Sequence, residues 1–355
     1  MKRIMLRLLL LLTGISSSFA NSVGNPIWET KLNEVLNEII IAHKIPGMSV
    51  AILENNEVVY QKGFGIAIVG QSKPVDEFSR FRAASITKLL TAQAVMMLVE
   101  QNKLKLDQTI GHYLPQFKGS EITIYHLLTH SSGFTDQVKP GLKERRISEY
   151  LHQVAKIKKL SQPGAVFSYS DTGFNILGAI ISNVSGMSYV QYIEKFILQP
   201  LALKNTGFYD DVTVDAEPHY KGTPIPKHQQ RPYDRSFAPS EGLITNVSDL
   251  ITWTKATMLM KTLLLDKNSY EKMLEPQIKT SWGEIWMGLG WQVYQSDNGQ
   301  VARHPGSVRG YKSLLLMYPQ QKRAIVILTN SSHTPRFEVA KTIEKILASH
   351  QSKQH

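Results

Sequence analysis

Residues 81–99, FRAASITKLLTAQAVMMLV, decide how the rest of the chain is interpreted. From residue 86 to residue 99 this stretch is apolar nearly all round, so it predicts a helix that is buried on every side. The helix opens with Ser85-Ile86-Thr87-Lys88. Because positions three apart lie on one helical face, the hydroxyl of Ser85 and the amine of Lys88 can meet there.

A serine hydroxyl next to a lysine amine is a recognised arrangement for nucleophilic catalysis. A serine alcohol is a weak nucleophile and needs a nearby base. A lysine can serve as that base if burial lowers its pKa, because desolvation disfavours the charged form. The helix N-terminus adds a dipole and free N–H groups that face developing negative charge. Taken alone, the same spacing also fits an N-cap Ser85 beside a solvated Lys88.

Two later segments carry further polar side chains. Tyr169-Ser170-Asp171 comes just before a predicted helix, and His304-Pro305-Gly306 comes before a predicted late strand. In a catalytic interpretation, Tyr169 relays a proton between the serine, the lysine and the leaving group. In the alternative interpretation, Asp171 or Thr172 only caps the helix, and the second segment is a loop histidine followed by a Pro-Gly turn.

Hydrophobic periodicity outlines the fold. The pattern predicts helices over 27–43, 173–185, 189–198, 249–260 and from 337 onward, and strands over 48–53, 58–61, 286–294, 313–318 and 324–329. We therefore expect an α/β (α+β) fold, in which an antiparallel sheet flanked by helices forms from both chain ends and an all-helical region is inserted. The sheet region would cover about 25–84 and 285–350, and the helical region about 85–284. A site would lie in the crevice between them.

The first twenty residues read as a secretory signal peptide. Lys2, Arg3 and Arg7 precede the apolar run 8–12, which is too short for a membrane span, and Ser18-Phe19-Ala20 fits a cleavage site. We expect a mature domain over 21–355, periplasmic or secreted, with no stable membrane span after cleavage. The alternative is an uncleaved anchor helix. The absence of cysteine excludes a lipid-modified N-terminal Cys, disulfides and thiolate metal sites.

The chain is basic, with a formal net charge of +11 from 40 basic and 29 acidic side chains. Cleavage after residue 20 would remove three basic and no acidic residues, leaving +8. A basic exported protein would sit near anionic envelope polymers such as those of peptidoglycan. The sequence shows no basic helix or aromatic-interleaved basic patch, so a solvated basic surface is favoured and no nucleic-acid partner is expected.

The three motifs together, in this order, are more specific than any one of them. Ser85-x-x-Lys88, then Tyr169-Ser170 and then His304-x-Gly306 resemble the serine β-lactamase and penicillin-binding protein superfamily. Within it the chain resembles the class C β-lactamase-related branch, which includes D-alanyl-D-alanine carboxypeptidases and esterases. The resemblance spans about residues 30–345. It also rests on FRAA at 81–84, LKLD at 104–107, YLP at 113–115, HLLTHSSG at 126–133, and the stretches 173–178 and 242–250.

The resemblance implies a role for each motif residue. Ser85 would form the acyl-enzyme, while Lys88 and Tyr169 would handle protons. The backbone N–H groups of Ser85 and Ser307 would form the oxyanion hole. Gly306 would let substrate approach the strand edge closely. No cofactor and no metal are implied.

Two departures from the family pattern bear on specificity. The family usually has Asn where Asp171 stands, and an Asn donates to substrate amides whereas a carboxylate cannot. Many members have Lys where His304 stands, so a permanent cation for a substrate carboxylate is missing, and Arg309 is a candidate replacement. His126 and His130 are expected to have structural roles in the family motif and not to be metal ligands. There is also no Glu-containing motif of the class A deacylation kind, and together these features lower the expectation of efficient β-lactamase activity.

The sequence therefore predicts an exported serine hydrolase that forms an acyl-enzyme with a small ester or amide. A D-amino-acid peptide of the cell wall is one such substrate. The alternatives are a class C-type β-lactamase and a catalytically weak penicillin-binding or sensor protein. The Ser85, Lys88 and Tyr169 set argues against the last of these, and Asp171 leaves it open.

Overall fold

The computed structural model describes residues 27–135, 147–209, 211–230, 232, 234–260 and 264–351. The predicted signal peptide, residues 1–20, lies outside the described residues. Among the helices of the described part, none is both long and apolar enough to cross a membrane.

One antiparallel sheet dominates the structure, with strand order β2-β1-β12-β11-β10-β9-β8-β7. Its strands come from both ends of the chain, which confirms the predicted fold class. The bounds are β1 (Gly47–Glu54), β2 (Glu57–Gly65), β7 (Ile278–Lys279), β8 (Trp286–Met287), β9 (Gln292–Ser296), β10 (Gly299–Val308), β11 (Tyr311–Tyr318) and β12 (Arg323–Thr329).

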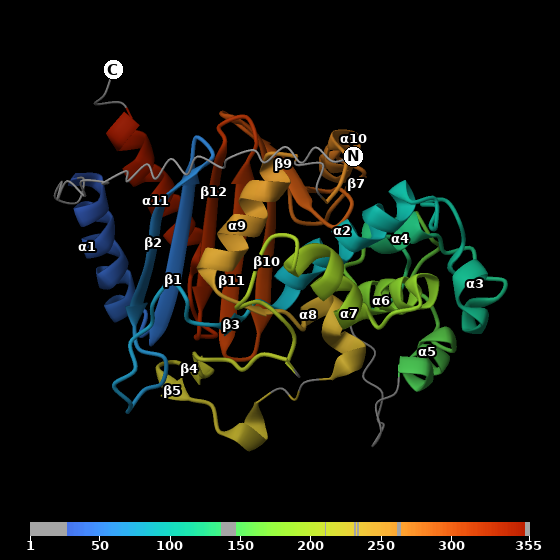
Figure 1. Ribbon diagram of the computed structural model, residues 1–355, viewed down its shortest axis with the longest axis horizontal. Helices are drawn as coiled ribbons and strands as arrows, with labels where there is room; N and C mark the ends of the chain where they lie inside the picture. The colour runs from blue at the N-terminus through green and yellow to red at the C-terminus, as the bar shows by residue number, and fades with distance from the viewer. Residues whose placement is uncertain are drawn as a thin grey trace, which may run out of the picture.

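Helices cover both faces of this sheet and form most of the inserted region. They are α1 (Ile27–Ala42), α2 (Thr87–Glu100), α3 (Ile110–Tyr113), α4 (Ile124–Leu128), α5 (Ile147–Ala155), α6 (Asp171–Ser185), α7 (Tyr189–Ile193), α8 (Ala238–Glu241), α9 (Val247–Met258), α10 (Lys267–Leu274) and α11 (Arg336–Gln351). Figure 1 shows α1 and α11 together beside the β2 end of the sheet, at the left, α9 in front of the sheet, and α2 to α7 gathered to the right of it.

Each face of the sheet has its own apolar core. On one face, Leu36 of α1 and Ile343 of α11 pack with Val50 and Ile327 of the sheet. On the other face, the alternate sheet residues, such as Val326, join the cluster that contains α2, α6 and α9. Because successive side chains of a strand point to opposite faces, the central strands are apolar on both. The sheet is thus a buried middle layer.

Local turn chemistry follows the sequence. Asn55 and Asn56 join β1 to β2 with φ of 51° and 65°, the left-handed values that a tight hairpin requires. Gly186, with φ of 71°, ends α6, and the hydroxyl of Ser188 caps α7 by accepting from the Gln191 N–H at 3.2 Å. These details confirm the predicted end of one helix at residue 185 and the predicted start of the next at residue 189.

The inserted region was predicted to be all helical, but it also contains short strands. It contains the two-residue strands β4 (His219–Tyr220), β5 (Thr223–Pro224) and β6 (Ile244–Thr245), and β6 pairs with β3 (Phe81–Arg82), which lies just before the region. The chain also returns to the main sheet at β7, before residue 285. Strands of two residues are too short to show an alternating pattern. The predicted helix 189–198 is also divided, because α7 gives way to a π-helical turn, η3 (Glu194–Leu198).

The segment His304-Pro305-Gly306 lies inside β10 and not before a strand. β10 pairs with β11 over 302–308, but its pairing with β9 ends at Arg303, so residues 304–308 have one open edge in the sheet. Proline lacks an N–H donor and is tolerated in a sheet at such an edge. A polar, proline-containing strand does not resemble the apolar runs that identified the other strands.

Candidate active site

Ser85 lies in a short 3-10 turn, η1 (Ala84–Ile86), that leads directly into α2. The preceding Ala84 has φ of 50°, a left-handed conformation that is uncommon and costly for a residue with a side chain. The buried Thr87 hydroxyl holds this turn, because it donates to the Ala84 carbonyl at 2.6 Å and accepts from the Leu243 N–H at 3.0 Å. Ser85 is partly exposed while its neighbours are buried, so it is accessible.

Lys88 is fully buried and its amine faces Ser85. Its Nζ donates to Asp171 Oδ1 at 2.5 Å and to the Ser240 carbonyl at 2.9 Å, and it lies 3.2 Å from Ser85 Oγ. An ammonium has three hydrogens, so these contacts account for all of them. This geometry rules out the solvated-lysine interpretation.

The charge of Lys88 depends on Asp171. Burial alone would lower the pKa of Lys88, but the carboxylate of Asp171, together with Tyr169, outweighs burial and raises that pKa above its usual value. Lys88 is therefore an ammonium at neutral pH. It must lose a proton before it can accept one from Ser85.

The cap of α6 is Ser170, whose hydroxyl accepts from the Gly173 N–H at 3.2 Å. The interpretation in which Asp171 or Thr172 only caps this helix is therefore wrong. Asp171 is the first residue of α6 and its carboxylate turns inward to Lys88.

Tyr169 completes the group around the nucleophile. Lys88 Nζ lies 4.9 Å from its ring centroid, and its hydroxyl is close enough to Lys88 and Ser85 for both to act on its pKa. Burial raises the pKa of Tyr169, while the positive charge of Lys88 opposes that rise, so the phenol is protonated at neutral pH. The structure thus brings Ser85, Lys88, Tyr169 and Asp171 together, although they come from segments far apart in the chain.

His130 holds the ring of Tyr169 in place, a role that the sequence did not reveal. The two rings stack with centroids 4.3 Å apart, and His130 Nδ1 accepts from the Ser170 N–H at 3.0 Å. His126, by contrast, belongs to the capping box of α4 with Thr123. No group of three or more potential metal ligands occurs within the described ranges.

His304 is buried near Tyr169, with ring centroids 6.3 Å apart. Its Nδ1 donates to the Pro305 carbonyl at 2.9 Å, which leaves Nε2 as an acceptor with no partner among the described residues. Burial, and then the charge of Lys88, lowers the pKa of His304 to about 3, so the imidazole is neutral. This position can accept a hydrogen bond but cannot supply a cation.

Gly306 makes room for protein atoms. A Cβ at this position would overlap the Ala83 carbonyl and the Ser313 hydroxyl, which themselves form a 2.7 Å hydrogen bond. The glycine therefore lets the open edge of β10 pack against the turn that precedes Ser85, whereas the sequence analysis gave close approach of substrate as its reason. The next residue, Ser307, is exposed, and its hydroxyl accepts from Lys312 Nζ at 2.6 Å.

The arrangement agrees with a comparison against known families, in which the profile described as Beta-lactamase matches residues 29–349. The chain belongs to the Beta-lactamase family. The family supports a serine hydrolase that works through an acyl-enzyme.

Individual relatives are distant. Protein flp of Staphylococcus aureus (strain NCTC 8325 / PS 47) is 25% identical over 334 residues, which cover 87% of this chain and 64% of that protein. The chain thus spans less than two thirds of that relative's length. The octameric penicillin-binding protein homologue from Pyrococcus abyssi superposes with a TM-score of 0.80 at 29% identity, covering 90% of this chain and 77% of that one. A class C beta-lactamase shares the fold, with a TM-score of 0.80 at 22% identity over 91% and 96% of the two chains.

Within this family fold, Arg336 is a cation that the sequence analysis missed. It begins α11, and its Nη1 donates to the Gly306 carbonyl. Burial, and then repulsion from Arg303, lowers the pKa of Arg336 to about 10, so it is charged at neutral pH. Arg309, the residue that the sequence suggested, is exposed and donates to Gln229 Oε1 at 3.1 Å. Only the folded chain brings α11 to the open edge of β10.

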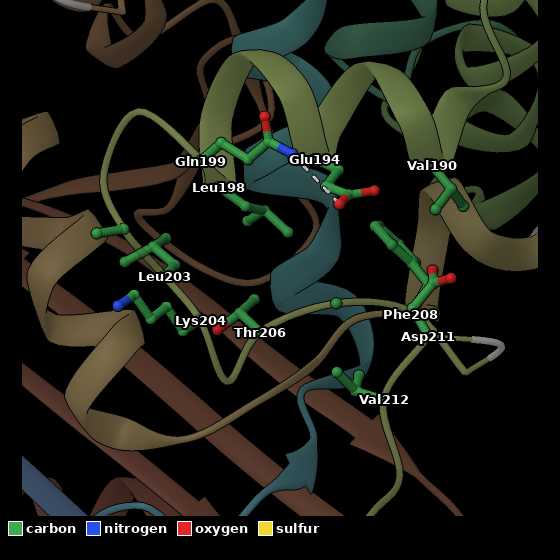
Figure 2. Close-up of a pocket in the computed structure, with 12 residues that line it drawn as sticks. Val190, Glu194, Leu198, Gln199, Leu203, Lys204, Thr206, Phe208, Asp211 and Val212 are labelled. Atoms are coloured by element: carbon green, nitrogen blue, oxygen red, sulfur yellow. Dashed lines mark hydrogen bonds between the residues drawn. The ribbon is translucent and has the colours of Figure 1, made fainter.

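A cavity of about 410 Å³ opens elsewhere, beneath α7 and η3. Figure 2 shows its apolar lining, including Leu198, Leu203 and Phe208, with the Glu194 carboxylate accepting from the Gln199 amide across the turn. None of the residues around Ser85 lines it. This cavity is therefore separate from the group formed by Ser85, Lys88, Tyr169 and Asp171.

Proposed function

We propose that the chain is an exported serine hydrolase in which Ser85 is the nucleophile. One observation carries this proposal: Lys88 Nζ is fully buried and lies 3.2 Å from Ser85 Oγ and 2.5 Å from Asp171 Oδ1. A lysine held in this way beside a partly exposed serine is arranged for proton transfer.

The proposed reaction has two balanced steps. Once Lys88 has lost its proton, Ser85 Oγ attacks the substrate carbonyl, and the Ser85 proton passes through Tyr169 and Lys88 to the leaving group, which departs as an alcohol or amine. Water then attacks the Ser85 ester, returns a proton to Ser85 and releases the acid. The backbone N–H groups of Ser85 and Ser307 would stabilise the oxyanion in both steps.

The proposed substrate is a small ester or amide, with a D-amino-acid cell-wall peptide as the biological example. A neutral His304 and the carboxylate of Asp171 provide neither the cation nor the amide donor that a β-lactam-type substrate would use. Arg336, bound to the Gly306 carbonyl, could instead pair with a carboxylate at the open edge of β10.

A catalytically weak penicillin-binding or sensor protein is the second candidate. The ammonium form of Lys88 favours it, because a protonated lysine does not activate a serine. The two candidates differ in whether Ser85 turns over an ester at neutral pH.

Labelling with a fluorescent phosphonate tests the nucleophile, because the probe reacts only with an activated serine. Ser85→Ala should abolish labelling and ester turnover, and should leave the melting temperature near that of the wild type, since one oxygen is removed. Ser120→Ala, at a partly exposed serine of another loop, is the matched control and should label normally. Turnover that persists in Ser85→Ala would eliminate Ser85 as the nucleophile.

Export is a separate part of the proposal. N-terminal sequencing of protein produced by a bacterial host should give Asn21 as the first residue, with the protein in the periplasm or medium. A product that keeps residues 8–12 and sediments with membranes would favour the anchor helix instead.

A further inference from the structure

A second cavity, of about 610 Å³, lies between the loop that follows residue 208 and the hairpin joining β10 to β11. Arg82 and Tyr311 line it from the strands, Arg309 from the hairpin turn, and Glu217 and Lys227 from the loop. Arg82 is in β3, three residues before Ser85, and Tyr311 pairs with Val308 at the end of β10. The cavity therefore adjoins the elements that position Ser85 and Ser307.

The cavity carries positive charge. Among the described residues that line it are three permanent cations, from Arg82, Lys227 and Arg309, and one carboxylate, from Glu217, which together carry a net charge of +2. Arg82 is only 7% exposed, so its guanidinium is largely shielded from bulk water. Charge interactions are stronger in such a shielded position than in water. Arginine presents a planar set of donors that matches a carboxylate.

The loop that forms one wall is fastened to the rest of the fold. The Tyr311 hydroxyl donates to the Ala216 carbonyl at 2.9 Å. Next to it, Asp215 accepts from Arg80 Nε at 2.7 Å and from Lys73 Nζ at 2.9 Å. These contacts hold residues 215–216 of the wall in place, and a wall that is already ordered lowers the entropic cost of binding.

The direction of β10 indicates which part of a substrate would reach the cavity. His304, in the middle of β10, lies near Tyr169, while Arg309 follows the C-terminal end of the strand, and five residues of extended chain span roughly 16 Å. Proton transfer to the leaving group takes place at the Tyr169 end. The acyl part of the substrate would therefore point toward Arg309.

We propose that this cavity binds a carboxylate carried by the acyl part of the substrate. The proposal rests on the proposed hydrolase function and makes that function more specific: acyl groups with a terminal anion are preferred over neutral ones of equal length. Arg309 and Lys227 at the mouth, with Arg82 deeper, supply the positive charge.

The test compares two esters with the same leaving group, para-nitrophenyl glutarate and para-nitrophenyl pentanoate. At low salt, kcat/KM should be about tenfold or more higher for the glutarate ester, the usual scale of one charge-assisted hydrogen bond. Arg309→Gln should reduce this ratio by a similar factor. Lys221→Gln, an exposed cation of the same loop that does not line the cavity, should leave the ratio unchanged. Equal kcat/KM values for the two esters in the wild type would overturn the proposal.

A binding measurement separates this proposal from the hydrolase assignment. Isothermal titration of Ser85→Ala with free glutarate should show binding that weakens about tenfold or more in the Ser85→Ala/Arg309→Gln protein. If neither ester is hydrolysed but glutarate binds in this way, the hydrolase function fails and the carboxylate site stands. If glutarate does not bind, or binds equally well without Arg309, the carboxylate site is wrong.

Discussion

Asp171 and Lys88 form a buried ion pair 2.5 Å long beside the proposed nucleophile. A buried charge is costly unless it is paired, so the carboxylate of Asp171 favours the charged form of Lys88. The pair keeps Lys88 as an ammonium, and a general base has to be unprotonated to act. At the scale of single residues, this pair sets the pH at which the site becomes active.

Replacing Asp171 by Asn should shift the acidic limb of the kcat/KM profile to lower pH. The carboxylate raises the pKa of Lys88, and burial alone would lower it, so its removal makes the neutral amine available in less alkaline solution. Amides and β-lactams should gain more than simple esters, because Asn restores an N–H donor for the substrate. The measurement is a pH–rate profile of both proteins on one ester and one amide.

Lys88→Met is the control for this experiment, since it keeps the length of the side chain and removes the amine. Its turnover should fall by about a hundredfold or more at every pH, the usual scale for loss of a general base. The double variant Lys88→Met/Asp171→Asn should be equally inactive but more stable than Lys88→Met, which removes the cation that pairs with the buried carboxylate of Asp171. Superimposable profiles for Asp171→Asn and the wild type would show that Asp171 does not control Lys88.

The sequence predicts part of this site and not the rest, for a physical reason. Ser85 and Lys88 meet because helix geometry fixes a spacing of three residues. Ser240 contributes a backbone carbonyl, which every residue possesses, and His130 acts through stacking on a ring 39 positions away. Such contacts depend on tertiary packing, and a single sequence carries no local signal for them.

At the scale of elements, β10 packs against the turn before Ser85 with the part of the strand that has no partner on its β9 side. Its glycine, Gly306, leaves space that the Ala83 carbonyl and the Ser313 hydroxyl occupy. The sequence pattern recovered the long apolar strands, because alternation or a continuous apolar run shows there. It missed β10 and the two-residue strands, since the first is polar and contains Pro305 and the others are too short.

Gly306→Ala should lower both stability and turnover. The added methyl would push the β10 edge away from the Ser85 turn, and overpacking of this kind costs about 1–3 kcal/mol. The added substitution Ser313→Ala should not restore activity, because the Ala83 carbonyl is backbone and remains in place. Denaturant unfolding and phosphonate labelling of the single and double variants measure both effects. Recovery of labelling in the double variant would show that only the Ser313 side chain is in the way.

At the scale of the whole molecule, the two ends of the chain meet on the sheet face opposite α9. Leu36 of α1 and Ile343 of α11 are both fully buried there, in the same core cluster as β11 and β12. The apolar spacing of both helices predicted that each would bury one stripe. It could not predict that they share a core, because contacts between chain ends leave no trace in local periodicity.

Ile343→Ala should therefore destabilise the protein without changing its chemistry. Deleting a fully buried isoleucine side chain costs about 2–5 kcal/mol through lost burial and the cavity left behind. The side chain lies in the core of the α1 and α11 face, and Ser85 belongs to the turn on the other face. Phosphonate labelling at a temperature where the variant is folded should thus match the wild type.

Lys345→Ala, at an exposed position of the same helix, is the control and should change stability by less than about 0.5 kcal/mol. If Ile343→Ala stays folded but labels slowly, a displacement of α11 changes the geometry around Ser85. Arg336 would transmit this change, because it joins the start of α11 to the Gly306 carbonyl.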